Sequence, residues 1–380
     1  MGVTERLAGF AAGRPRAFVV AAPGGTAARV AVEAVLRRRA WRQPDGPVAA
    51  DLLVVCGAPG TDLAEAIDVV WDDMPAPRAR TMISGTPTPD EAAAALDEAT
   101  DGRHGGHGGG HEGGHGHETS APAEPDMADR AADRDGLTLD VLHVRLGPVL
   151  ADWPAGLRVA TSIQGDVIQS AEAAVLGGAS ARPFWDAPWL AAAAGEPVTR
   201  GAAERSRAAA HLDSLGRLLS VAGWADAARR AERLRDEALA GRAAGALVPA
   251  FSAFARRVGR SRSLRWMTSG LGVIDERAVR RYDLAGPAAR HPGDVAARLT
   301  GWLTEAEHAL ARVDDADPLA GGEGPRGPAR EAPSAGLLAV LPELLEGSEL
   351  AAARLIVASL DPDADQLSRS AAAGEEAADG

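Results

Sequence analysis

The chain has 380 residues, enough for two ordinary domains, and 46% of its residues are hydrophobic although only 4% are aromatic. Its formal net charge of −13 argues against a nucleic-acid-binding protein, and all 40 of its cationic residues are arginines. The single cysteine, Cys56, excludes an internal disulfide framework and an all-cysteine cluster site within the chain. The first residues lack the apolar core of a signal peptide, and no stretch reaches the roughly 18 apolar residues of a spanning helix, so we expect a cytoplasmic protein.

The first predicted unit covers residues 1–99 and alternates buried strands with amphipathic helices. Continuous apolar runs at residues 17–21 and 51–56 are typical of buried strands, and each run ends in a turn rich in Gly and Pro. Helical spacing follows at residues 26–39 and 62–71. This alternation predicts a parallel sheet covered by helices on both faces. Cys56 ends the second strand, so we interpret it as an inert core thiol.

Residues 100–136 have no periodicity and few apolar side chains, which predicts a disordered linker. Imidazoles suit zinc, nickel and copper, so a histidine-rich stretch of this linker is the candidate metal site of the chain. Its glycines make ordering costly and its spacing is loose, so an expanded low-complexity His/Gly tract is the preferred interpretation. The histidines of this tract are His104, His107, His111, His115 and His117.

The second predicted unit covers residues 137–318, and its final part returns at residues 337–367 after a Gly/Pro-rich break at 319–336. Strand-like segments near residues 141–144 and 157–168 precede a helical stretch from about residue 187 to residue 313. Residues 368–380 form an acidic, alanine-rich tail that we expect to be disordered. His143 and His211 lie in a strand-like run and on a helix face, where histidines are more often structural than catalytic.

The first unit resembles the cluster-binding small subunit of complex I. In that family a buried strand ending in Gly is followed by a helix whose end reads Tyr-Asp-Gln-Met-Pro-Glu-Pro-Arg. The string here is Trp71-Asp72-Asp73-Met74-Pro75-Ala76-Pro77-Arg78. The family then places a cluster cysteine after Met-Gly-Ser, where this chain has Thr86 after Ser84-Gly85. The paired cysteines expected after the first strand are replaced around residues 23–26.

The second unit resembles the large, catalytic subunit of complex I and of nickel–iron hydrogenases. Residues 270–290 match its Gly-Val-Gly-Val-Ile, acidic helix start and Gly-Pro-x-x-Arg, and residues 341–362 are similar to its C-terminal end. In the hydrogenases an Asp-Pro introduces a cysteine pair that binds nickel and iron. Here Asp361-Pro362 leads only to Asp363-Ala364-Asp365-Gln366. Ala155-Gly156 stands where complex I carries a quinone-facing His-Gly.

The resemblance implies an α/β protein: a flavodoxin-like N-terminal parallel-sheet domain, then an α+β domain dominated by a helix bundle. It also implies that the two units pack together like the subunits they resemble, across the linker. A four-iron cluster needs about four thiolates and a nickel–iron centre four more, so one cysteine cannot serve either. The sequence has no P-loop lysine and no GxGxxG at the start of a helix, so it gives no support for NAD or ATP binding either. We therefore assign no catalytic or cofactor-binding residues and expect no cofactor, with nickel or zinc at the histidine tract as the exception.

Our leading hypothesis is a cluster-free pseudo-subunit, a structural or assembly component of a complex I-like or hydrogenase-like respiratory complex. One alternative is an NADH–quinone oxidoreductase subunit that takes part in electron transfer with clusters supplied by partner chains. Another is a protein that handles nickel or zinc through its histidine tract. The expected partners are other subunits of such an assembly, not nucleic acid. We expect membrane contact only through those subunits, with the chain peripheral at the inner face of the cell membrane.

Overall fold

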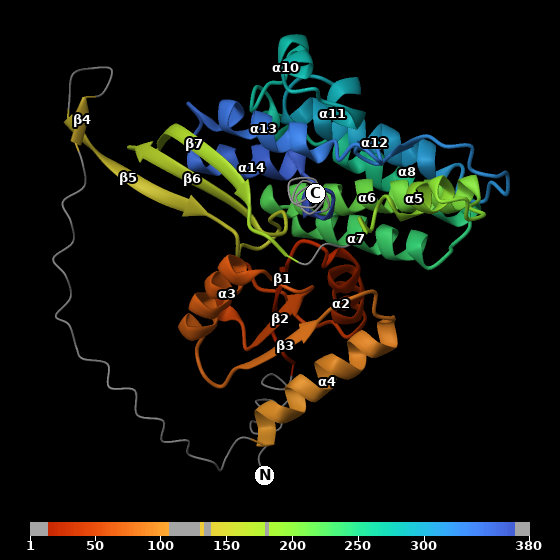
Figure 1. The fold of residues 1–380 in the computed structure, drawn as a ribbon, viewed down its shortest axis with the longest axis horizontal. Helices are drawn as coiled ribbons and strands as arrows, with labels where there is room; N and C mark the ends of the chain where they lie inside the picture. The colour runs from red at the N-terminus through yellow and green to blue at the C-terminus, as the bar shows by residue number, and fades with distance from the viewer. Residues whose placement is uncertain (1–13, 106–129, 133–137, 179–181, 369–380) are drawn as a thin grey trace, which may run out of the picture.

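The computed structural model describes residues 14–105, 130–132, 138–178 and 182–368. An N-terminal unit built on a small parallel sheet packs against a larger helical unit that carries an antiparallel sheet (Figure 1). This arrangement confirms the predicted fold class. No helix among the described residues is long and apolar enough to cross a membrane.

The N-terminal sheet has the strand order β1-β2-β3, with all neighbours parallel. Its strands are β1 (Ala17–Ala21), β2 (Leu52–Cys56) and β3 (Ala79–Ile83). The first two match the predicted apolar runs, and β2 is buried along its whole length, as a central strand covered on both faces must be. Strand β3 was not predicted, because as an edge strand it alternates polar and partly exposed residues.

Helices cover both faces of this sheet. Helices α2 (Thr26–Arg38) and α4 (Pro89–Gly105) pack on one face, where Leu52, Val54 and Cys56 point. Helix α3 (Thr61–Asp73) packs on the other face against Leu53 and Val55. The short 3-10 helix η1 (Pro47–Ala49) lies beside α3.

The helical unit has one continuous core around α6 (Arg200–Val221), which contacts α7 (Ala225–Leu239), α12 (Val295–Leu310) and α14 (Leu350–Leu360). The face of α6 that lies toward this core includes Leu212, Leu215 and Leu219, which are all buried. The other helices are α5 (Ala187–Ala193), α8 (Ala244–Gly259), α9 (Arg262–Thr268), α10 (Glu276–Arg281), α11 (Gly286–Arg290) and α13 (Ser334–Leu345).

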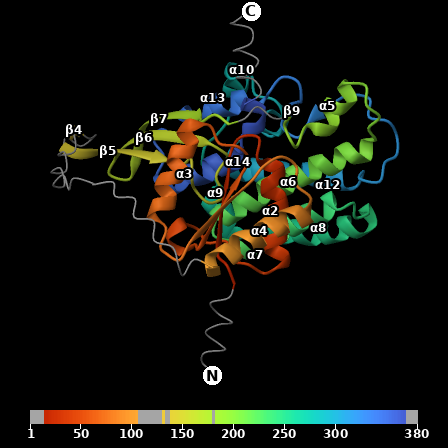
Figure 2. The same ribbon diagram turned by 60° about the horizontal axis from the view of Figure 1, so that its bottom comes forward.

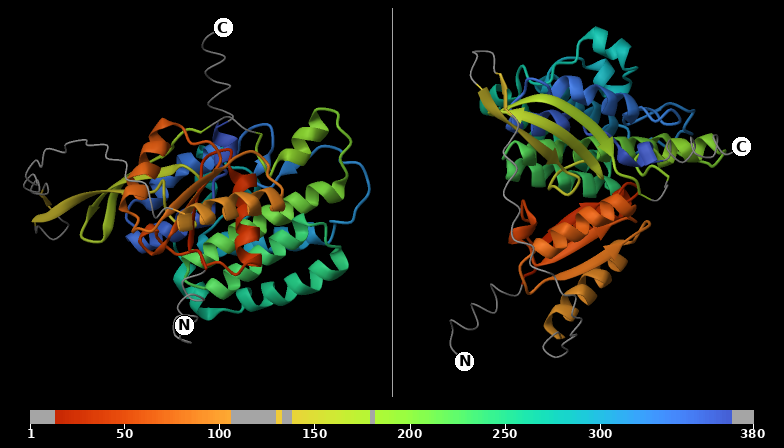
Figure 3. Two further views of the ribbon diagram at one scale, coloured as in Figure 1. Left: turned by 90° about the horizontal axis from the view of Figure 1, so that it is seen from below. Right: turned by 60° about the vertical axis from the view of Figure 1, so that its left-hand side comes forward.

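An antiparallel sheet of order β4-β5-β6-β7 packs beside this core, where β7 contacts α13 (Figure 3). Its strands are β4 (Arg130–Ala132), β5 (Thr138–Leu146), β6 (Leu157–Gln164) and β7 (Val167–Val175). The inner face of β6 and β7 contributes Leu157, Val159 and Ile168 to the core.

Three elements cross the predicted boundaries. Helix α4 continues to Gly105, past residue 99, where the first unit was predicted to end. Strand β4 falls inside the expected linker 100–136 and pairs with β5. The expected break at 319–336 contains the short hairpin of β8 (Glu323–Gly324) and β9 (Gly327–Pro328) and the start of α13.

Candidate functional site at the junction of the two units

The loop after β1 closes directly onto the end of β2. The Ala22 amide donates to the Cys56 carbonyl oxygen over 2.8 Å, and the Gly57 amide donates to the Ile83 carbonyl oxygen over 2.8 Å. A side chain at Gly25 would overlap the Cys56 carbonyl group. One at Gly57, which has φ +93°, would approach the Gly25 Cα to 2.8 Å. The two strand ends therefore meet at backbone distance, where side chains of cluster ligands have no room.

Loops of the helical unit cover the same strand ends. The Gly60 amide donates to the Gly177 carbonyl oxygen over 3.0 Å. A Cβ at Gly178 would lie 2.7 Å from the Pro23 carbonyl oxygen, and one at Gly156 would lie 3.0 Å from the Pro23 Cγ. Glycine on both sides thus permits this close approach between the units.

The turn after β3 differs from the two loops described above. Its residues Ser84, Gly85 and Thr86 are all solvent-exposed. Strand β3 is the edge of the sheet farthest from β1, so the turn that follows it stays outside the contact. The position that the resemblance gives to a cluster cysteine, Thr86, is therefore a surface residue.

The segment after α14 is the second place where the resemblance puts metal ligands, and here it holds buried carboxylates. Asp361 ends α14 in a left-handed conformation with φ +40°. Its carboxylate accepts hydrogen bonds from Arg326 Nη2 and Ser214 Oγ, each over 2.7 Å, and from Arg217 Nη1 over 3.1 Å. Asp361 therefore ties the C-terminal turn to α6 and to the β8–β9 hairpin.

Asp365 links this turn to the N-terminal unit. Its Oδ1 accepts a hydrogen bond from the Gly24 amide over 2.7 Å, so the carboxylate holds the loop that follows β1. Asp363 is buried beside it, and its backbone amide donates to Ser334 Oγ over 2.9 Å. Burial and their mutual repulsion raise the pKa of Asp363 well above its ordinary value, and burial raises the pKa of Asp365.

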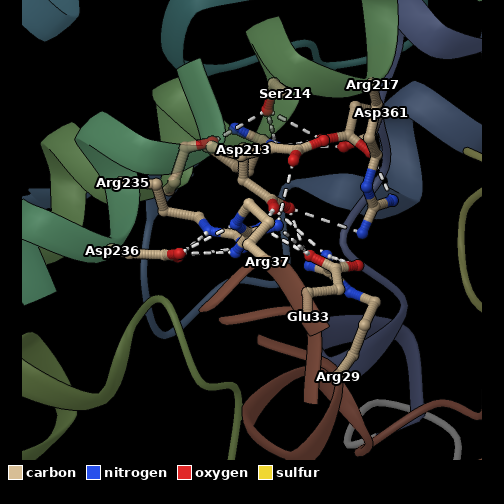
Figure 4. Close-up of polar contacts among 12 residues, drawn as sticks. Arg29, Glu33, Arg37, Asp213, Ser214, Arg217, Arg235, Asp236 and Asp361 are labelled. Atoms are coloured by element: carbon tan, nitrogen blue, oxygen red, sulfur yellow. Dashed lines mark hydrogen bonds and ion pairs between the residues drawn. The ribbon is translucent and has the colours of Figure 1, made fainter. Parts of the chain in front are cut away.

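A network of ion pairs joins α2 of the first unit to α6 and α7 of the second (Figure 4). At its centre Asp213 accepts from Arg29 Nη2 over 2.7 Å and from Arg235. Glu33 binds the same two arginines, with Arg29 Nη1 at 2.9 Å and Arg235 Nη1 at 2.8 Å. One turn further along α2, Arg37 binds Asp236 over 2.6 Å and Glu232 over 2.9 Å.

The electrostatics of this network favour the charged forms. Burial opposes ionisation of Glu33, but the charges of Arg29 and Arg235 outweigh it and lower the pKa of Glu33 to about 2. The same competition, between burial and the charges of Arg29 and Arg217, lowers the pKa of Asp213. Because each buried charge is balanced by several opposite ones, the network acts as a connector between the units.

A polar cleft of about 900 Å³ lies beside the network, between β1 and the helices α6 and α7. Its lining includes Phe18, Trp153 and Asp152 together with the network arginines. The Asp152 carboxylate accepts from Ser220 Oγ over 2.6 Å, and burial raises the pKa of Asp152 to about 6. Arg29, Glu33 and Asp213 of the network also line this cleft, so the interface is charged and open on this side.

The residues at these positions do not fit the metal centres that the resemblance implies. Cys56 is fully buried, and burial raises the pKa of its thiol, so it is held as a neutral thiol rather than a thiolate. Asp363 and Asp365 offer hard oxygens where the hydrogenase centre takes thiolates, and burial raises the pKa of both. His211 is buried on α6, and burial together with Arg326 lowers its pKa. Within the described part of the chain, no group of three or more His, Cys, Asp or Glu side chains is arranged to hold a metal ion.

The predicted histidine site falls mostly beyond the described residues. His104 lies in the last turns of α4, and nothing is described of its side chain. His107, His111, His115 and His117 lie outside the described residues, and the metal prediction for this tract stays a prediction. Of the other histidines considered, His143 is exposed on β5, whereas His211 is buried and structural in position.

Sequence reasoning missed the junction residues. The spacing of Arg29, Glu33 and Arg37 does predict ion pairs along one helix face. Nothing local indicates that Asp213, 184 positions beyond Arg29, completes the set.

Comparisons with known proteins give no family. No protein-family model matches the chain, and no curated protein matches it significantly. Among solved structures, the chain is similar to one in the membrane-bound sulfane sulfur reductase, an archaeal respiratory membrane complex. That likeness has a TM-score of 0.45 and 15% sequence identity, and covers 60% of this chain and 99% of the other. At these values it supports no functional assignment for this chain.

Proposed function

We propose that the chain is a cluster-free pseudo-subunit: a structural or assembly component of a complex I-like or hydrogenase-like respiratory complex. The proposed kind of complex comes from the two motif resemblances, which follow each other along the chain in the order small subunit, then large subunit. The proposal that it works without clusters comes from the chain's own residues. The protein would present a preassembled pair of units to its partner subunits.

One observation carries the proposal: the residues at both former ligand positions bind each other across the junction. The loop of residues 23–26 stands where paired cysteines are expected, and its Gly24 amide donates to Asp365. Asp365 in turn stands where the hydrogenase cysteine pair would follow Asp361-Pro362. Because Asp365 binds the Gly24 amide, the two positions that the resemblance marks for metal ligands here contribute to the contact between the units.

The ion-pair network gives the same contact its specificity. Breaking a buried ion pair costs several kcal/mol, about 3–5, so Asp213 and its arginines favour one relative placement of the units. A fixed placement suits a component whose outer surfaces must match several partners at once. A catalytic role would need a reactive group in a cleft, and in the polar cleft beside β1 the charged residues Arg29, Glu33 and Asp213 already bind one another in this network.

The proposal is tested by metal analysis of the full-length protein purified anaerobically. We expect iron, acid-labile sulfide and nickel far below one equivalent per chain, with no visible absorbance of an iron–sulfur centre. The same protein, tagged and recovered from its native membranes by mild detergent, should migrate with other subunits of a respiratory complex. Stoichiometric iron and sulfide in the isolated chain would overturn the cluster-free assignment, and migration as a lone chain would overturn the assembly role.

A further inference from the structure

Helices α8 and α9, which are labelled in Figure 2, form a surface with a concentration of arginines that the proposed function does not use. We call it the basic face. The chain as a whole carries a net charge of −13, yet residues 238–274 contain no Asp or Glu. The basic face consists of the exposed residues Arg256, Arg257, Arg260, Arg262, Arg265 and Trp266.

The arginines of this face differ from the junction arginines in their partners. Among the described residues, none of the five forms an ion pair, and Arg257 instead stacks over the Trp224 ring at 5.3 Å. Asp226 lines the same groove as Arg257, and Asp275 is the first acidic residue along the chain after α9. Arginines that fold stability does not engage are available to an external anion.

The geometry of the face suits a phosphate-bearing surface. A hollow of about 530 Å³ is lined by Arg260, Arg262 and Arg265, together with Trp266 and two serines, and by no acidic residue. Trp266 is 83% exposed, which is unusual for a large indole side chain, and Met267 and Val273 beside it are also exposed. A second groove of about 340 Å³, lined by Arg230, Arg233 and Arg257, extends the positive charge onto α7, although Asp226 lies at its edge.

We infer that the basic face docks directly onto a membrane surface rich in anionic phospholipids. Guanidinium groups bind phosphate through paired N–H donors, and an exposed tryptophan flanked by arginines is typical of the bilayer interface. Nucleic acid is a weaker fit, because the face offers one aromatic side chain for stacking and the rest of the protein would repel a polyanion. This inference goes beyond the proposed function, which expected membrane contact only through partner subunits, and it does not depend on whether the chain binds a cluster.

The test is flotation of the purified full-length protein with vesicles. One set contains phosphatidylcholine alone, and the other adds phosphatidylglycerol to about one third, near the anionic content at which basic clusters bind. We expect binding to the anionic vesicles only, weakened by added salt because screening shortens the reach of the charges. The variant Arg260→Glu/Arg262→Glu/Arg265→Glu should lose roughly tenfold or more in vesicle partitioning. Trp266→Ala should weaken binding by a smaller factor.

A matched control makes the same charge change elsewhere. Arg38, Arg312 and Arg354 are exposed and form no ion pair among the described residues, so Arg38→Glu/Arg312→Glu/Arg354→Glu has the same net charge as the test variant. This control should bind anionic vesicles nearly as the unmodified protein does. Equal loss in both triple variants, or no binding of the unmodified protein to anionic vesicles, would overturn the inference. So would tight binding to single-stranded DNA that the test variant abolishes while vesicles remain unbound.

Discussion

The junction network and the basic face use the same side chain in opposite ways. At the junction, Arg29 and Arg235 are buried and each binds both Glu33 and Asp213. On the basic face, Arg260, Arg262 and Arg265 are exposed and bind no carboxylate among the described residues. An arginine-rich composition therefore does not by itself indicate what the arginines do, because the role of each arginine depends on the residues that it contacts.

The comparison also separates arginines that stabilise the fold from arginines that are free to bind a partner. A buried guanidinium that loses its carboxylate leaves an uncompensated charge inside the protein, whereas an exposed guanidinium stays hydrated. The junction arginines should thus govern stability and the basic-face arginines should govern association. Each prediction below tests one side of this division, starting with the largest expected effect.

Replacing Asp213 by alanine should cause the largest loss of stability. The change would leave Arg29, Arg217 and Arg235 near one another without their shared carboxylate. Removing one partner of a buried ion pair typically costs about 3–5 kcal/mol. Urea unfolding followed by circular dichroism would measure it.

The control for this variant is Asp226→Ala. Asp226 pairs with Arg229 on the exposed surface of α7, where solvent screens the interaction, so its loss should change stability little. Equal losses in the two variants would mean that the junction network does not contribute more than a surface ion pair, and the contrast drawn above would fail.

The closed loop after β1 should tolerate no added methyl group. In Gly25→Ala the new Cβ would overlap the Cys56 carbonyl group, so one of the two strands must move. Overpacking of this kind costs about 1–3 kcal/mol. Gly46→Ala is the matched control, since nothing lies within 4 Å of its Cβ position. If thermal unfolding showed the two variants to be equally stable, the strand ends would be open enough to admit side chains.

The cleft side of the junction should make stability depend on pH through Asp152. Burial raises the pKa of this carboxyl from 3.8 to about 6 in the folded state. The folded protein therefore holds this proton more tightly than the unfolded chain does. The resulting stability is fully present below the unfolded pKa of 3.8 and is lost as the pH rises through about 6. Between pH 4 and pH 7, the unmodified protein should lose on the order of 2 kcal/mol relative to Asp152→Asn. Asp363 and Asp365 act in the same direction in both proteins, so the difference isolates Asp152.

Glu33 should make stability depend on pH in the opposite direction. Its pKa is lowered to about 2, so its contribution is present above the unfolded value and disappears only as the pH falls towards 2. A stability difference between the Asp152→Asn variant and the unmodified protein that grew on acidification, instead of on raising the pH, would contradict the assignment of Asp152.

Local patterns predicted the elements whose burial is continuous or periodic. Residues 17–21 and 52–56 are unbroken apolar runs, and β1 and β2 formed there. Strand β3 was missed because Arg80 and Thr81 lie on an edge strand, where solvent tolerates polar side chains. Helix α4 was not predicted as an element, and it extends past the predicted end of the first unit at residue 99.

The junction could be predicted only as a contact and not as a set of residues. The resemblance implied that the two units pack together, and the bond from the Gly24 amide to Asp365 confirms that they do. Its partners lie 341 positions apart, and no spacing rule connects residues at that distance. The absence of cysteines at these positions was visible in the sequence, but the contacts that Asp361 and Asp365 make there depend on tertiary placement.

The smallest expected effect belongs to the basic face. Arg260→Glu/Arg262→Glu/Arg265→Glu should change the free energy of unfolding by no more than about 0.5 kcal/mol, as surface substitutions usually do. A slight loss of stability is expected from Arg265→Glu, because Arg265 lies in the last turn of α9, where a cation is favoured over an anion. The measurement is the same urea titration used for Asp213→Ala, so that the two arginine environments are compared on one scale. A loss approaching that of Asp213→Ala would show that these arginines are part of the fold's own electrostatics, and any reduced vesicle binding would then follow from unfolding.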